Sequence, residues 1–197
     1  MSFGKFSFDN HSRRRRWMAF LSLSFVLLLL IPASPSEEEK DTGWDSATIL
    51  TEFDLNDVIA MNSTSAIAVG DSGKLYLTEN SGANWSELDS GVVQDLNSIE
   101  FNEQAVAVGD SGTVLVRDED SWTDNSIEGA GNLHNLSVPH FESLSNSTIF
   151  VSGTGGEIWK WSNNSWSDLS NGTGTDVDIY AIDFIDNDKG FAVGADG

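Results

Sequence analysis

The chain has 197 residues, no cysteine and a formal net charge of −21. The absence of cysteine excludes disulfides and a lipoprotein anchor. Beyond residue 36, five basic residues stand against 30 acidic ones, a net charge of −25. A surface of this sign repels nucleic acid and anionic membranes, so we expect neither as a ligand of this part of the chain.

The N-terminus has the layout of an export signal. A basic region, 1–16, contains four consecutive arginines, an apolar segment, 17–33, follows, and an acidic linker, 34–43, comes next. A helix of the 15 residues from Trp17 to Ile31 would be roughly 22 Å long, shorter than a bilayer core of about 30 Å, which favours a signal peptide. No clear cleavage site follows, so an uncleaved signal anchor is the alternative. We expect an extracytoplasmic protein, either secreted or anchored in the cell membrane by an N-terminal hydrophobic helix.

A short glycine-containing motif, which we call the glycine motif, then recurs four times along the chain. Its anchoring glycines are Gly70, Gly109, Gly153 and Gly194, spaced 39, 44 and 41 residues apart. This period is typical of the four-stranded blade of a β-propeller. The repeated turn positions that we single out are Gly70, Asp71, Gly73, Gly109, Asp110, Gly112, Gly153, Gly156 and Gly194.

Each repeat carries the same order of short apolar and alternating segments, which predicts four strands. In the first repeat these are 55–61, 66–69, 74–78 and 85–88. We expect blades over 54–91, 95–130 and 132–174, and an incomplete blade over 178–197. The predicted fold class is all-β, a partial β-propeller of about three and a half blades preceded by one hydrophobic helix.

One further strand, 44–50, precedes the first repeat. Trp44 begins it as Trp85, Trp122 and Trp166 begin the fourth strands of their blades. Propellers close as rings of about 4–8 blades, so we interpret the chain as a fragment. We hypothesise that the strand at Trp44 completes the last blade of the closed ring; an ordinary linker strand is the alternative.

The turn after the third strand of the first repeat carries a family resemblance. Residues 78–85 resemble the Asp-box, or BNR, turn through Thr78, Asn80, Gly82 and Trp85. With the order of strands, the chain resembles the BNR-repeat propellers of the photosystem II stability/assembly factor family over residues 44 to 197. The second and third copies of the turn are degenerate. We expect this turn to be structural, with short side chains capping its own backbone N–H groups.

Acidic side chains and glycosylation triplets allow further interpretations. Asp71, Asp110 and Asp196 should lie on one rim, where they cap turns or present negative charge to a basic partner. Calcium is possible but unsupported, because no Asp-x-Asp-x-Asp-Gly loop is present. Possible N-glycosylation acceptors are Asn62, Asn84, Asn135, Asn146, Asn163 and Asn171.

No catalytic residue and no metal ligand stands out. Arg117 is the single arginine past the export signal, whereas a sialidase needs an arginine cluster to hold a substrate carboxylate. His134 and His140 lack a third ligand at set spacing, and polar loop histidines are the simpler interpretation. We expect no cofactor and no enzymatic activity.

Three functions follow from the sequence. The first is a non-catalytic, exported or membrane-anchored propeller that binds another protein during assembly of a membrane or envelope complex. The resemblance implies photosystem II assembly, although the arginine-rich partner surface of that family is missing here. The second is a glycan-binding or glycoside-hydrolase propeller with its site in further blades, and the third is a structural surface glycoprotein. Fold alone does not choose among them.

Overall fold

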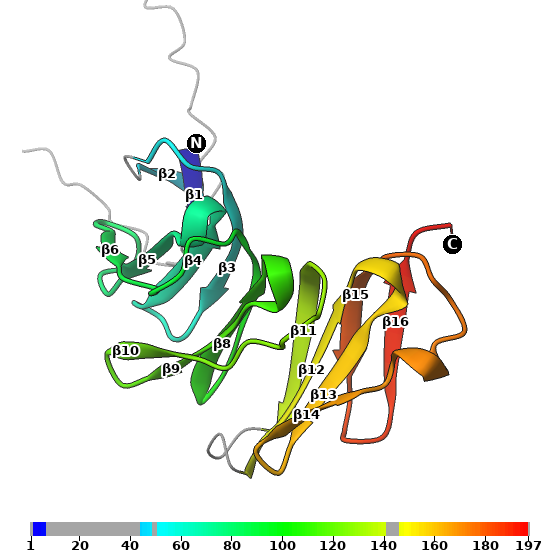
Figure 1. Cartoon of the computed structure of the whole chain (residues 1–197). Helices are drawn as coiled ribbons and strands as arrows, with labels where there is room; N and C mark the ends of the chain where they lie inside the picture. The colour runs from blue at the N-terminus through cyan, green and yellow to red at the C-terminus, as the bar shows by residue number, and fades with distance from the viewer. Residues whose placement is uncertain (1, 7–43, 49–50, 141–145, 197) are drawn as a thin grey trace, which may run out of the picture.

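The computed structural model describes residues 2–6, 44–48, 51–140 and 146–196. Within them the chain forms three four-stranded antiparallel sheets and two two-stranded sheets. Figure 1 shows the three four-stranded sheets and the two-stranded sheet nearest the C-terminus following one another in chain order, each beside its sequence neighbour. The predicted partial propeller of four-stranded blades is confirmed, while the predicted hydrophobic helix at 17–33 lies outside the described residues.

The complete blades are regular meanders. Blade 1 contains β3 (Leu55–Ala60), β4 (Ala66–Gly70), β5 (Leu75–Thr78) and β6 (Ser86–Leu88). Blade 2 contains β7 (Leu96–Asn102), β8 (Gln104–Gly109), β9 (Val114–Asp118) and β10 (Ser121–Asp124). Blade 3 contains β11 (Leu133–His140), β12 (Thr148–Gly153), β13 (Ile158–Ser162) and β14 (Ser165–Asp168).

Shorter sheets lie at the two ends of the chain. The half-blade at the C-terminal end contains β15 (Ile179–Phe184) and β16 (Gly190–Gly194). At the N-terminal end, β2 (Trp44–Thr48) pairs with β1 (Ser2–Phe6), a strand that the sequence pattern did not predict. The proposed role of the Trp44 strand in closing a ring therefore stays a prediction.

Neighbouring blades pack through their inner strands. The first strands β3, β7, β11 and β15 contact one another in sequence, and β7, β11 and β15 also contact the second strand of the preceding blade. Between blades 1 and 2 this contact buries Ile67 and Val69 of β4 against Ile99 of β7. Between blades 2 and 3 it buries Val106 and Val108 of β8 against Leu136 of β11. The core is thus a series of similar layers between blades rather than one central cluster.

The glycine motif forms the turn between the second and third strands of each blade. Each complete blade has a short 3-10 turn there, with the middle residue at positive φ. At Gly109 a Cβ would lie 2.0 Å from the carbonyl oxygen of Asp95, at the start of the first strand of the same blade. Only glycine permits this approach, and the equivalent position is glycine in all four repeats.

Candidate binding surface

The first strand of every blade has a bulge directly after its first residue. The register shifts across Asn56 in β3, Asn97 in β7, His134 in β11 and Tyr180 in β15. A bulge leaves one residue out of the ladder and redirects its side chain. At the first two positions it turns an asparagine toward the rim of glycine turns and the neighbouring blade.

These two asparagines join consecutive blades in the same way. The amide of Asn56 donates to Asp71 Oδ1 of its own blade and to the carbonyl of Leu96 in blade 2, both at 3.0 Å. The amide of Asn97 donates to Asp110 Oδ1 at 3.0 Å and to the carbonyl of Leu133 in blade 3 at 2.8 Å. Asp71 and Asp110 therefore accept bonds from asparagine side chains of their own blades, and their proposed capping of the turns stays a prediction.

A second rim contact uses the residue just before each first strand. Asp95 Oδ1 accepts the N–H of Ser72 at 2.8 Å, and Asn132 Oδ1 accepts the N–H of Ser111 at 3.1 Å. Asp178 Oδ1 accepts the N–H of Gly155 at 3.0 Å. Each donor is the middle residue of the preceding blade's three-residue glycine turn, and it has positive φ. We call this repeated contact the rim clasp.

The inner strands carry a third set of polar contacts between blades. Asp57 Oδ2 accepts the hydroxyl of Ser98 and the N–H of Ile99, both at 2.9 Å. The amide of Asn135 donates to the Ser98 hydroxyl, and its oxygen accepts the N–H of Ile182. These bonds therefore link side chains of blades 1, 2 and 3 along the first strands β3, β7 and β11, which form the inner face of the propeller.

The carboxylate of Glu100 is affected by its own burial and by carboxylates of two other blades. Glu100 of β7 accepts the N–H of Val138 in β11 at 2.8 Å. Burial raises the pKa of Glu100, the Val138 hydrogen bond opposes this, and the negative charges of Asp183 and Asp57 raise the pKa further. The inner strands β3, β7 and β15 therefore each contribute a carboxylate to this part of the molecule, and Glu100 is affected by the charges of the other two.

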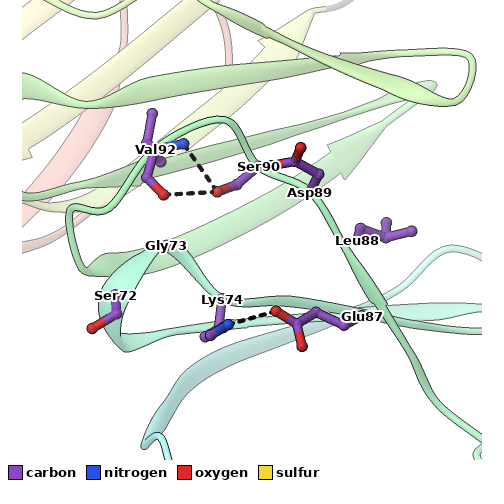
Figure 2. A pocket seen from close by; sticks show the side chains of 8 residues that line it. All are labelled: Ser72, Gly73, Lys74, Glu87, Leu88, Asp89, Ser90 and Val92. Atoms are coloured by element: carbon purple, nitrogen blue, oxygen red, sulfur yellow. Dashed lines mark hydrogen bonds and ion pairs between the residues drawn. The ribbon is translucent and has the colours of Figure 1, made fainter.

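A surface hollow of about 320 Å³ lies at the rim between blade 1 and the segment that leads to blade 2. Figure 2 shows Lys74 and Glu87 pointing toward each other beside Ser72, with Ser90 and Val92 on the other side. The Lys74 ammonium lies 2.5 Å from Glu87, which raises the pKa of Lys74. Because the two charges neutralise each other and no nucleophile with an adjacent base lines the hollow, its residues do not form a catalytic arrangement.

The turn at residues 78–85 is held by its own side chains. Thr78 Oγ1 accepts the N–H of Gly82 at 2.9 Å, and Asn80 Oδ1 accepts the N–H of Asn84 at 2.8 Å. Ser81 and Gly82 have positive φ, and Trp85 lies half-buried at the head of β6. These bonds satisfy the loop's backbone donors. The resemblance to an Asp-box repeat stays a prediction.

The remaining candidate residues lie apart from one another. Arg117, the single arginine of the described residues, is half-buried, with Nη1 3.7 Å from the sulfur of Met61. His134 Nε2 is 4.0 Å from Asp178 Oδ2. Among the described residues, no three histidine or acidic side chains gather in a way that would hold a metal ion. The helices of the described part are all too short or too polar to cross a membrane.

The glycosylation triplets differ in their surroundings. Asn135 is half-buried between blades and its amide nitrogen donates to Ser98, so a glycan there would break this bond. Exposed side chains occur at Asn62, Asn84, Asn146, Asn163 and Asn171. Glycosylation of these five stays a prediction.

The comparisons with known proteins concern the fold. No family model and no curated protein matches the sequence. A solved structure described as YCF48 bound to a D1 peptide is similar, with a TM-score of 0.55 and 16% identity over 78% of this chain and 51% of that chain. YCF48 from Cyanidioschyzon merolae also matches, with a TM-score of 0.42 and 15% identity over 79% of this chain and 72% of that chain. The chain thus spans about half the length of the peptide-bound structure and shares its propeller fold.

Proposed function

We propose that this chain is a non-catalytic propeller module that binds another protein during assembly of a larger complex. The observation that carries the proposal is the likeness in fold to a propeller described with a peptide bound. The described residues also form a rigid scaffold of repeated inter-blade bonds around an inner face of polar and acidic groups. Such a face suits an extended protein segment that presents basic side chains.

The role in assembly is the more specific part of the proposal. We infer that the propeller works outside the cytoplasm, delivered or anchored by residues 17–33, where it would hold a segment of a membrane or envelope protein. If residues 17–33 crossed a membrane, β1 and β2 would lie on opposite sides of it. The pairing of β1 with β2 and anchorage by this segment are therefore mutually exclusive states of the chain.

Peptide binding tests the function directly. Fluorescence anisotropy would compare a lysine-rich extended peptide with a glutamate-rich peptide of equal length. We expect binding of the basic peptide only, weakened several-fold by Asp183→Asn and by added salt. Asp120→Asn, at an exposed turn remote from the inner face, is the matched control. Equal binding of the two peptides, or equal losses in the two variants, would contradict the proposed site.

Export has its own test. Alkaline phosphatase fused after residue 43 becomes active only if the segment carries it out of the cytoplasm, and protease protection of vesicles reports the same topology. We expect activity that disappears when Arg13 to Arg16 and the apolar segment are deleted. An inactive fusion would exclude export without affecting the peptide-binding prediction.

A further inference from the structure

The first strand of each blade is an edge strand on the inner face of the propeller. It pairs only with the second strand of its own blade, so its other edge carries no sheet partner. The N–H and C=O groups along such an edge can pair with the main chain of another segment. An extended protein segment at this face can therefore be held in two ways, as an added strand or through its side chains.

Side chains of the preceding blade bond to the N–H groups along these edges. Asp57 Oδ2 of β3 accepts the N–H of Ile99 in β7 at 2.9 Å, and Glu100 Oε2 of β7 accepts the N–H of Val138 in β11 at 2.8 Å. Two more bonds join β15 to β11, Ile182 N–H to Asn135 Oδ1 at 3.0 Å and Phe184 N–H to Ser137 Oγ at 2.9 Å. All four donors are the fourth or sixth residue of their strand, as expected where every second N–H points away from the paired strand.

Carbonyl groups of the same edges are bonded by asparagine amides of the preceding blade. These bonds run from Asn56 to Leu96 at 3.0 Å, from Asn97 to Leu133 at 2.8 Å and from Asn102 to Val138 at 2.9 Å. The rim clasp adds a contact between blades directly before each of β7, β11 and β15. Both N–H and C=O groups on the edges of β7 and β11 are therefore already bonded within the chain.

These bonds are shielded from solvent. Ile99, Val138 and Ile182 are 3%, 6% and 5% exposed. A segment that paired with these strands would displace the side-chain acceptors and leave them, with the carboxylate of Glu100 among them, without a partner in a poorly hydrated place. Leaving such groups unsatisfied costs free energy, so main-chain pairing is unfavourable at these edges.

We propose that the side-chain bonds between blades close the inner edges to strand addition, so that a segment bound at the inner face is held through its side chains. The presence of a bound segment rests on the proposed function, whereas the closure of the edges does not. Recognition would then depend on the sequence of the partner segment, because an extended main chain alone finds no free row of hydrogen-bonding groups on β7 or β11.

Amide hydrogen exchange of the full chain in mild detergent measures the closure without a partner. We expect slow exchange at Ile99, and Asp57→Ala should speed it at least about tenfold while leaving Val108 of the central strand β8 unchanged. Asp57→Asn keeps an oxygen acceptor and should keep exchange slow. Asp120→Ala, at an exposed turn, is the matched control.

Two results would overturn the closure of the edges: fast exchange at Ile99 in the native chain, and unchanged exchange at Ile99 in Asp57→Ala. If Asp57→Ala fails to fold, the native exchange rates decide by themselves. They should be slow at all four bonded amides, those of Ile99, Val138, Ile182 and Phe184.

Fluorescence anisotropy then determines how a segment is held. A lysine-rich peptide would be compared with peptides of the same sequence that carry N-methyl groups at every second residue, in either register. We expect dissociation constants equal within about twofold, because methylation removes only main-chain donors. A loss of about tenfold or more in one register would overturn the proposal. If no peptide binds, the proposed function is wrong, and the exchange rates still decide whether the edges are closed.

Discussion

The second strands β12 and β16 have similar apolar sequences but differ in how far their side chains are exposed to solvent. Phe150 of β12 is 1% exposed and stacks on Phe184 with ring centroids 3.5 Å apart. Phe191, at the equivalent position of β16, is 73% exposed. The apolar pattern that makes a strand is the same in both. What differs is the presence of a following first strand, so in this architecture burial is a property of the neighbouring blade.

Truncation of each phenylalanine tests whether the two strands differ in their contribution to stability, and it has the largest expected effect. Phe150→Ala should lower the free energy of unfolding by about 3–5 kcal/mol, because it removes a buried ring and leaves a cavity. Phe191→Ala should change it by less than about 0.5 kcal/mol, because this ring is largely exposed. Urea denaturation measures both. Similar losses in the two variants would show that the Phe191 ring is buried in solution.

A second prediction concerns the turns that all blades share. Gly109→Ala should destabilise the chain by about 1–3 kcal/mol, because the new Cβ meets the Asp95 carbonyl. Gly172→Ala is the matched control, since nothing lies within 4 Å of its Cβ position. Thermal denaturation followed by circular dichroism distinguishes them. A neutral Gly109→Ala would show that the turn can move away from the first strand.

The bonds between blades give a smaller expected effect. Asn97→Ala removes the bonds to Asp110 and to the Leu133 carbonyl, and should cost about 1–2 kcal/mol. Asn56→Ala removes the equivalent pair between blades 1 and 2 and should cost a similar amount. Asn171→Ala, at an exposed site, should be silent in protein made without glycosylation. Unequal losses of unfolding free energy in the Asn56 and Asn97 variants would show that the contacts between successive blades are not equivalent.

The smallest predicted effect depends on pH. Because the pKa of Glu100 is raised in the folded chain, the folded state binds more protons than the unfolded state between the ordinary and the raised pKa. Stability should therefore fall as pH rises through this window. Glu100→Gln should be more stable than the native chain at neutral pH and equal to it in acid. Lower stability of the variant at neutral pH would show that the carboxylate is favoured by the fold.

The sequence predicted the order of strands within each blade well, because each strand is short and lies between features that recur in every repeat of this chain. In the first repeat, the predicted strands at 55–61, 66–69, 74–78 and 85–88 each differ from the observed strand (β3, β4, β5 and β6) by one residue at one end. The repeated Leu-Asn at 55–56 and 96–97 was a visible signal for the blade joints, yet its meaning was missed. An alternating pattern does not reveal a bulge, and the bulge is what redirects these asparagines.

By itself, the sequence determined the period, the strands and the need for glycine at each turn, since these depend on contacts within one repeat. Only the tertiary structure decided which residues act between repeats. It placed Asp57 against Ser98 and Ile99 of the next blade, joined Asp95 to the turn before it, and left Phe191 exposed. The physical reason is that these properties depend on the distance between chain segments some 40 residues apart, which the packing of one blade on the next fixes.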